Sequence, residues 1–403
     1  PRGALKGSAS GDAAQVFIRL HEEVGRAYGT ADGDAVGEGP DDPVAYLLDL
    51  EKAYPRVNRP LLWALLRRLG VPPTIVRTLQ GLHEETVFRV RGKEGVSGQW
   101  QPQRGLREGC ATSPILFNVY HGIAVTHGQS RREAAARARG LVAGIRWQWQ
   151  PGHSLPPRCV SRALRSLTAQ EFRLQLSLFA DDTTVCGHRE EVVGGKEVFV
   201  RALADLEERC NAAKEECMVL GRESGGKIRM LGSFPDRHFD LQQRISRLRR
   251  SWWTVRARLR GSHLSKRTQA RVVEACVEST ALFDAGVRPW YQRELQRLQS
   301  EIDRCYRWIW VGGFGREPLR RMEERGVNMW GVRAQLGVGS VALKVEKRVL
   351  QRIGHVLRMP NENPCKQVVL GWYPLRQEGS GRIRQSTIDY WRTVLRRMGL
   401  DPD

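Results

Sequence analysis

Alternating apolar and polar residues lead into two adjacent aspartates near the middle of the chain. In the stretch FRLQLSLFADDTTVCG, leucine or alanine occupies every second position from Leu174 to Ala180, which is the pattern of a half-buried strand. The β-branched residues that follow the aspartates favour a return strand. The pattern therefore predicts a tight hairpin with Asp181 and Asp182 at its tip.

The two adjacent carboxylates have more than one explanation. Carboxylates at one hairpin tip repel each other, and a hard divalent cation with oxygen ligands relieves that repulsion. Aspartate is also common in turns, because its side chain tolerates turn geometry. The pair alone therefore leaves a metal site and a polar turn open.

Other hydrophobic patterns predict a mixture of strands and helices. The continuous apolar run from Val44 to Leu48 is typical of a buried strand that ends at Asp49, although a run so short also fits a helix. A hairpin is expected over 86–103 and a short strand or hairpin over 227–234. Apolar residues at helical spacing predict helices over the ranges 13–28, 60–69, 74–82, 113–123, 190–214, 241–260, 265–285, 291–310 and 386–398.

The middle of the chain also contains a segment without a clear period. Ser113 and Pro114 provide the N-cap and the first position of the helix before it. Residues 128–170 follow, with a basic Ala/Arg run at 131–139 and a Trp-rich stretch. We interpret 128–170 as an insertion between core elements.

The segment from Leu241 to Arg260 combines an apolar stripe with one-sided positive charge. Its apolar residues recur at spacings of three and four, so they share one helix face. It holds seven arginines and no acid, and the arginines fill the other faces. Such a helix is either a solvated surface or a rail for a phosphate backbone, and the overall charge favours the rail. The arginines expected to contact phosphates are Arg244, Arg247, Arg249, Arg256 and Arg258.

The composition supports a polyanionic partner. The chain has 65 Lys and Arg against 44 Asp and Glu, a formal net charge of +21, and a pI near 10.2. Nucleic acid is the first candidate partner and a membrane surface is the second. No stretch approaches the roughly 18 continuous apolar residues that span a bilayer, so we expect no membrane insertion.

The cysteines and the first residues indicate a compartment. The 8 cysteines form no CxxC pair and no zinc-finger spacing, which favours scattered, reduced thiols. The first residues show no apolar segment of a signal peptide. We therefore expect an intracellular protein, in the nucleus or the cytoplasm.

Five motifs follow one another in a fixed order across residues 46–234. They are LLDLEKAY, RGLREGCATSPILFN, LFADD, NAAKEE and RMLGS. Together they resemble the palm of reverse transcriptases, in particular those of non-LTR (LINE-type) retrotransposons. The flanking stretches SASGDAAQVFIRLHEEV and RIGHVLRMPNENPCKQVVLGW are similar to segments of the same elements. Motif order and spacing are more specific than any single motif.

The resemblance implies an α+β fold with a polymerase palm, a small antiparallel sheet backed by helices, followed by a helical thumb and a basic C-terminal extension. The implied parts are a remnant of the fingers with a pre-palm helix (1–43), the palm with its insertion (44–235), the thumb (236–310) and the extension (311–403). The family's other fingers motifs would lie upstream of Pro1, so we expect the chain to be N-terminally incomplete.

The activity implied by the resemblance is RNA-directed DNA polymerisation. Asp49, Asp181 and Asp182 would hold two Mg²⁺ ions, with Mn²⁺ as an alternative, and join a dNTP to a primer 3′-hydroxyl by two-metal nucleotidyl transfer. The implied partners are an RNA template, a DNA primer and dNTPs. The other implied site residues are Lys214 as proton donor to pyrophosphate, Tyr54 as steric gate, Glu108 and Gly109 as nucleotide contacts, and Leu231, Gly232 and Ser233 as primer grip.

Some of these residues also fit simpler roles. Tyr54 could be a core tyrosine and Lys214 a surface lysine. Glu108 replaces the family's usual glutamine, and Pro55 replaces an acid that often follows the steric gate. These differences favour an alternative, a decayed or fragmentary relative that only binds RNA. A palm-containing RNA polymerase is a third possibility, against which Tyr54 argues.

Overall fold

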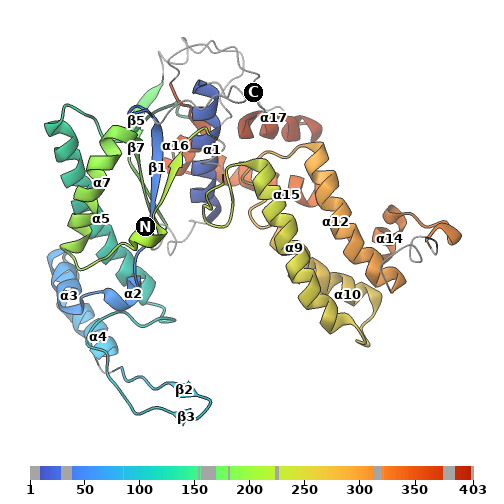
Figure 1. Ribbon diagram of the computed structural model, residues 1–403, viewed down its shortest axis with the longest axis horizontal. Coiled ribbons are helices and arrows are strands. Elements are labelled where there is room, and N and C mark those ends of the chain that lie inside the picture. The colour runs from blue at the N-terminus through green and yellow to red at the C-terminus, as the bar shows by residue number, and fades with distance from the viewer. Residues whose placement is uncertain are drawn as a thin grey trace. The chain divides into compact units, whose positions relative to one another are not determined.

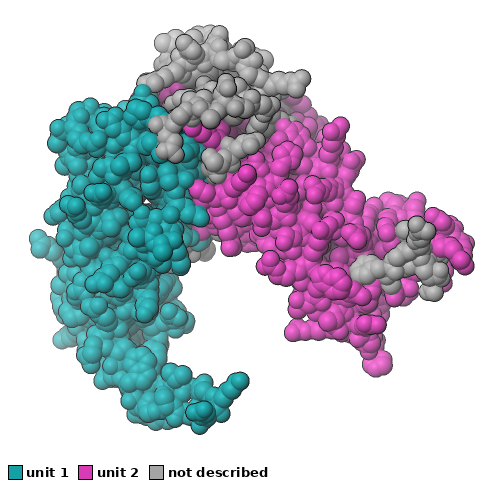
Figure 2. All heavy atoms as spheres, in the orientation of Figure 1, with its two compact units in different colours: residues 1–10, 34–146, 173–219 teal, residues 11–33, 147–172, 220–403 magenta. Residues whose placement is uncertain are grey.

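The computed structural model describes residues 10–28, 39–84, 86–152, 155, 169–179, 182–222, 227–312, 320, 322–374 and 386–400. The chain forms two compact units, which Figure 2 colours separately. Unit 1 comprises Pro1–Ser10, Asp34–Arg146 and Arg173–Val219, and unit 2 comprises Gly11–Gly33, Trp147–Phe172 and Leu220–Asp403. Helices and small antiparallel sheets make up the described residues, which confirms the α+β class.

Unit 1 is built on a four-stranded sheet (Figure 1). The strand order is β6-β7-β1-β8, and each neighbouring pair is antiparallel. The strands are β1 (Pro43–Leu48), β6 (Leu176–Phe179), β7 (Asp182–His188) and β8 (Glu216–Val219). Phe179 of β6 pairs with Asp182 of β7. The buried strand before Asp49 and the antiparallel pair of strands that leads into Asp182 are therefore confirmed, with Asp182 as the first residue of β7.

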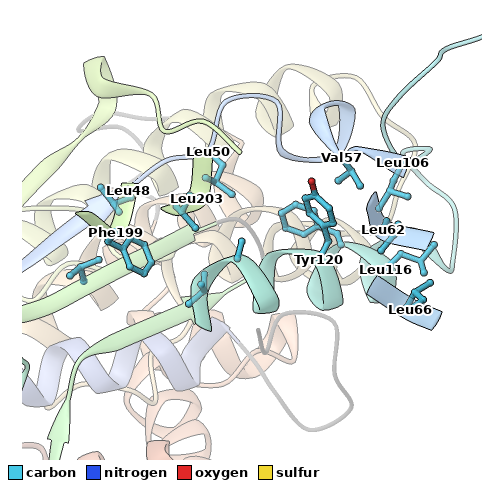
Figure 3. Close-up of a cluster of buried hydrophobic side chains, with 14 of the residues drawn as sticks. Leu48, Leu50, Val57, Leu62, Leu66, Leu106, Leu116, Tyr120, Phe199 and Leu203 are labelled. Atoms are coloured by element: carbon cyan, nitrogen blue, oxygen red, sulfur yellow. The ribbon is translucent and has the colours of Figure 1, made fainter. Parts of the chain in front are cut away.

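Two long helices of unit 1 pack on each other and cover one face of this sheet. They are α5 (Ser113–Ala138) and α7 (Arg189–Ala204). Their apolar side chains meet alternate residues of β1 in a buried cluster, in which Figure 3 shows Leu48 near Phe199 and Leu203. Because side chains alternate along a strand, the residues next to Leu48 face the opposite side of the sheet.

Shorter elements complete unit 1. They are α2 (Ala53–Arg56), α3 (Arg59–Arg68), α4 (Pro73–Glu84), β2 (Arg91–Gly92), β3 (Gly95–Val96) and η1 (Ala212–Lys214). Asn58 caps α3 by accepting a hydrogen bond from the backbone N–H of Leu61, as its sequence predicts. The predicted hairpin is also present, as the pair β2 and β3. A separate two-stranded sheet consists of β4 (Ile145–Trp149) and β5 (Gln170–Leu174), of which only Ile145, Arg146, Arg173 and Leu174 are assigned to unit 1.

The predicted insertion at 128–170 begins too early. Helix α5 continues through the basic run to Ala138, and its N-cap is Thr112 instead of Ser113. The side chain of Arg132 is buried and donates two hydrogen bonds, at 2.7 and 2.6 Å, to the carboxylate of Glu191 in α7. Residues 128–138 therefore continue α5, and Gly128, Arg132 and Ala136 of this range are buried in unit 1.

The helix predicted over 190–214 is too long. Helix α7 ends at Ala204, and Glu207 then adopts a positive φ of 61° that reverses the chain. Cys210 forms an isolated antiparallel bridge with Leu50, just beyond β1. Lys214 consequently lies in η1, a short 3₁₀ turn before β8.

Unit 2 is mainly helical. Its helices are α1 (Ser10–Tyr28), α9 (Arg237–Leu259), α10 (Lys266–Val273), the π turn η2 (Glu274–Glu278), α11 (Ser279–Ala281), α12 (Gln292–Val311), α14 (Met329–Leu336), α15 (Val341–Arg358), α16 (Pro364–Leu370) and α17 (Thr387–Arg397). The helices predicted over 241–260, 291–310 and 386–398 are confirmed apart from their end residues, whereas the helix predicted over 265–285 ends early, at Ala281, and contains the π turn. No helix within the described ranges is both long and apolar enough to cross a membrane.

Helix α1 packs with the C-terminal helices of unit 2. Its buried Arg19 donates hydrogen bonds to the backbone carbonyls of Val369 and Gly371, at 3.0 and 3.1 Å. Asp12, also buried, pairs with Arg352 of α15. These contacts join the first helix and the C-terminal segment, which the sequence assigns to separate parts, in one unit.

Candidate active site and nucleic-acid surface

Asp49 and Asp182 lie at the same end of two neighbouring strands. The β1–β7 ladder ends with Leu48 opposite Thr183, so Asp49 and Asp182 are the next residues along the same register. Since Leu48 faces the buried helices, the two aspartates fall on the other face of the sheet. Asp182 is exposed, and the Asp49 side chain is 34% exposed. Asp181 lies outside the described residues.

Lys214 contacts Asp49 directly. Its Nζ donates a hydrogen bond to Oδ2 of Asp49 at 3.0 Å, and its side chain is 64% exposed. The backbone fixes this pairing, because the N–H of Asn211 donates to the carbonyl oxygen of Asp49 at 2.8 Å. The Asn211 side chain then caps η1 through the N–H of Ala213. The turn that carries Lys214 is thus held at Asp49 by the backbone hydrogen bond from Asn211 and by the side-chain hydrogen bond from Lys214.

Tyr54 is half-buried at the edge of the core. Its ring stacks on Phe117 of α5, with centroids 4.9 Å apart and planes inclined by 17°. Its carbonyl accepts a hydrogen bond from the N–H of Leu106 at 2.9 Å. A Cβ on Gly105, whose φ is +87°, would lie 2.7 Å from the backbone of Pro55. Only glycine lets this loop approach α2 so closely, and the sequence did not identify that requirement.

Glu108 and Gly109 are exposed on the same loop. Gly109 has a φ of +77°, and no atom lies within 4 Å of a Cβ built on it, so the backbone conformation and not space requires glycine. The next residue, Cys110, has an unusual thiol. Hydrogen bonds from Thr112 lower the pKa of Cys110 to about 6.

His121 of α5 is a buried residue that the sequence prediction missed. Its Nδ1 lies 2.9 Å from Oε2 of Glu208, and its Nε2 lies 2.9 Å from Oγ1 of Thr183. Its ring also stacks on Phe117, at 5.4 Å and 8°. Phe117 in turn stacks on Tyr54, so consecutive contacts through Phe117 and His121 link Tyr54 to Thr183, the residue after Asp182. The spacing of Phe117 and His121 by four residues is the only sequence signal for this arrangement.

The donor atoms at this end of the sheet fit a hard divalent cation. Asp49 and Asp182 supply carboxylate oxygens on one face, both accessible to solvent, and Mg²⁺ prefers such ligands. Among the described residues, no group of three or more His, Cys, Asp or Glu side chains is placed to hold a metal. The third expected ligand, Asp181, is outside that part of the chain.

Arg244 corrects one prediction for the basic helix. Its side chain is fully buried in unit 2, where it pairs with Asp240 and donates to the carbonyl of Ala281 at 2.9 Å. Asp240 is buried as well and also binds Arg288, at 2.9 Å. Arg244 therefore holds the fold together and does not lie on a phosphate-binding face.

The other predicted arginines of α9 differ in exposure. Arg247 is half-buried, and burial lowers the pKa of its guanidinium. Arg249 is 57% exposed but pairs with Glu301 of α12. Arg256 lies over the ring of an exposed tryptophan. Arg258 is exposed and makes no ion pair with any described residue. Arg249, Arg256 and Arg258 thus remain accessible to a phosphate backbone.

The predicted primer-grip residues form a tight turn in unit 2. Met230 and Ser233 exchange backbone hydrogen bonds of 2.8 and 3.0 Å. Leu231 and Gly232 between them have φ values of 48° and 95°. A positive φ at both central positions is typical of a type I′ hairpin turn, and leucine adopts it only with strain.

The structure thus brings Asp49, Asp182 and Lys214 together at one end of the central strands of unit 1. Tyr54 and the Glu108–Gly109 loop belong to the same unit, whereas the turn at 230–233 and the arginine helix belong to unit 2. No protein-family model matches the chain. A function must therefore be argued from these residues.

Proposed function

We propose that the chain is an RNA-directed DNA polymerase, a reverse transcriptase of the non-LTR retrotransposon type. The observation that carries the proposal is the placement of Asp49 and Asp182 at adjacent strand ends, with Lys214 bonded to Asp49. In this proposal the sheet of unit 1 with α5 and α7 is the palm, α9 to α12 are the thumb, and the later helices are the C-terminal extension.

The carboxylates would bind the metal ions of the reaction. Two Mg²⁺ ions held by Asp49, Asp182 and Asp181 would, when bound, lower the pKa of the primer hydroxyl and neutralise charge on the phosphates. Asp49 and Asp182 are suited to this because they reach solvent on one sheet face. Lys214 carries a proton at Nζ beside Asp49 and is the candidate donor to the leaving pyrophosphate.

Tyr54 and the arginine helix would select and hold the substrates. Phe117 supports the Tyr54 ring from one side, so the ring forms a fixed wall that would crowd a ribose 2′-hydroxyl. The exposed arginines of α9 would bind template and primer through their phosphates, independently of sequence.

A second candidate function is RNA binding without turnover. The observation that favours it is the exposed carboxylate of Glu108, which stands in the loop expected to contact a negatively charged triphosphate. The basic surface of α9 would serve this function equally well.

Primer extension separates the two candidates. The full chain is given a DNA primer annealed to an RNA template, Mg²⁺ and dNTPs, and Asp49→Asn is compared with wild type. A metal ligand contributes several kcal/mol, so we expect a loss of about 100-fold or more. Asp205→Asn is the matched control, because Asp205 is a half-exposed acid of unit 1 whose ion-pair partners among the described residues, His127 and Arg131, have exposed side chains.

The outcomes are distinct. Extension by wild type and Asp205→Asn but not by Asp49→Asn supports the polymerase. Equal extension by wild type and Asp49→Asn overturns the proposed site. Absence of extension in every variant, with RNA binding retained, supports the second candidate instead.

A further inference from the structure

Trp253 is an exposed aromatic side chain on the basic helix α9. It is 62% exposed, whereas the adjacent Trp252 is 5% exposed. The apolar stripe of α9 is buried in unit 2, through Leu241, Ile245, Leu248, Trp252 and Leu259. Trp253 is therefore not part of that core, and its indole meets solvent.

Neighbouring helices fix the orientation of Trp253. Helix α9 lies beside α10 and α12 (Figure 1), and it packs against both. Trp252 meets Trp308 of α12 edge to face, with centroids 5.4 Å apart and planes at 77°. Since consecutive helical residues point about 100° apart, anchoring Trp252 holds Trp253 outward. A side chain presented by a rigid helix loses little entropy when it binds a ligand.

Positive charge surrounds this indole. The Arg256 guanidinium lies 4.8 Å from the centroid of the Trp253 ring. Arg250 is one turn earlier on the same helix face, and Arg260 is the exposed C-cap residue that follows the last turn of α9; neither pairs with an acid among the described residues. The only acid of α9, Asp240, is buried. The exposed surface around Trp253 therefore attracts anions.

We propose that Trp253 and these arginines form a binding site for single-stranded nucleic acid. An unpaired base stacks on the indole, and the phosphates on either side contact Arg250, Arg256 and Arg260. Every base has a π face, so such stacking tolerates any sequence. A duplex keeps its bases stacked inside and offers no free face to the indole. The site goes beyond the proposed polymerase, because it requires binding alone and no turnover.

An anionic membrane is the competing partner for a basic helix with an exposed tryptophan. Membrane-surface helices bury a whole apolar face in the lipid. The apolar face of α9 is already buried against other helices of unit 2. Trp253 is then the side chain of α9 left to enter a lipid surface, which is less than a whole apolar face. A single exposed ring is, however, sufficient to stack one base. The geometry therefore favours nucleic acid.

Binding assays with the full chain, without Mg²⁺ or nucleotides, test the site. Fluorescence anisotropy would measure the Kd of a labelled dT 20-mer, an abasic strand of equal length and a DNA duplex. A stacked base is worth about 1–3 kcal/mol, so Trp253→Ala should weaken dT binding by about 5- to 150-fold. Trp253→Phe should restore most of the affinity. The abasic strand and the duplex should bind both variants like wild type.

Two further variants complete the design. Trp330→Ala removes another exposed tryptophan of unit 2, on α14 and 73% exposed, and should leave dT binding unchanged. Replacing Arg250 and Arg260 with Gln should reduce the slope of log K against log salt by about 1.4, since each lost phosphate contact removes about 0.7 for single strands. Trp253→Ala should leave that slope unchanged.

Phosphatidylserine vesicles serve as the membrane ligand in a parallel binding assay. Three results would overturn the proposal. They are unchanged dT affinity in Trp253→Ala, an equal loss of affinity for the abasic strand, and a loss of affinity for the vesicles but not for dT. The polymerase is tested separately by primer extension, which measures turnover, whereas the assays above measure binding without Mg²⁺ or nucleotides.

Discussion

Two regions present opposite charges by different means. One is the sheet end of unit 1 where Asp49 follows β1 and Asp182 begins β7, called the carboxylate end, and the other is helix α9 of unit 2. At the strand ends, the backbone register alone sets Asp49 and Asp182 side by side on one face. On α9, each residue points about 100° from the last, so a run of arginines is distributed around the whole helix. One member, Arg244, is buried, while Arg258 is exposed. A strand pattern thus predicts which way a charged side chain points, whereas a run of charges along a helix does not.

Each surface is nevertheless supported by a buried ionic or polar pair. Beneath the carboxylate end, His121 joins Glu208 to Thr183. Inside unit 2, Asp240 binds Arg244 and places the first turns of α9. Removing one partner of such a pair leaves a charge without compensation in the interior. Mutation should therefore separate the supporting residues from the surface residues in both regions.

The largest effect is expected for Arg244→Ala in α9. Its loss leaves the buried carboxylate of Asp240 with Arg288 as its remaining cation, and we expect the free energy of unfolding to fall by about 3 kcal/mol. Arg258→Ala, on the exposed side of the same helix, should cost less than about 0.5 kcal/mol. Urea unfolding of both variants measures the difference. Equal, small losses would mean that Arg244 lies on the surface after all.

A smaller effect is expected for His121→Ala. Glu208 is 6% exposed and would lose its hydrogen-bonding partner, which should cost about 2–3 kcal/mol. The matched control is His127→Ala on the same helix, because His127 is 39% exposed and contacts only a half-exposed Asp205. Urea unfolding measures the stability of both variants. If extension is observed, preference for dNTPs over rNTPs should also fall in His121→Ala, since Tyr54 loses support through Phe117. An unchanged preference would limit His121 to stability.

The sequence predicted the elements that depend on local patterns. The strand before Asp49, the hairpin that leads to Asp182 and the capped helix after Asn58 all follow from period and turn chemistry. The family resemblance gave Lys214 only as the proton donor to pyrophosphate, so its hydrogen bond to Asp49 was not predicted, and the helix expected to carry it is a short turn. Neighbouring residues determine the strand, the hairpin and the capped helix, so a single sequence reveals them.

The remaining features depend on partners far along the chain. Arg132 is indistinguishable from the other arginines of the run at 131–139 until Glu191 is packed against it. Arg244 is similarly defined by a buried Asp240 and by carbonyls of another segment. The pairing of His121 with Glu208 has no local signal on either side. Burial of a charge depends on tertiary packing, which periodicity does not encode.

Arg249 offers the finest test of the comparison, because an acid masks its charge. Its guanidinium binds Glu301 of α12, and this hydrogen bond is the main cause that lowers the pKa of Glu301. Glu301→Gln should release the positive charge and steepen the salt slope of single-strand binding by up to about 0.7. Arg249 is 57% exposed and Glu301 16%, so water screens the pair in part and the variant should lose less than about 1 kcal/mol of stability. Anisotropy at several salt concentrations measures the slope.

The dependence on pH has a defined sign. Since the pKa of Glu301 is lower in the folded chain, the pair contributes its stability above the ordinary value of 4.5 and loses it as the pH falls through the folded value. Wild type should therefore bind single-stranded DNA as tightly as Glu301→Gln at low pH, and more weakly than Glu301→Gln at pH 7. Glu324→Gln removes the same charge and frees Arg320, which does not belong to α9. If both variants steepen the slope equally, net charge controls binding, and α9 is not the surface that holds the strand.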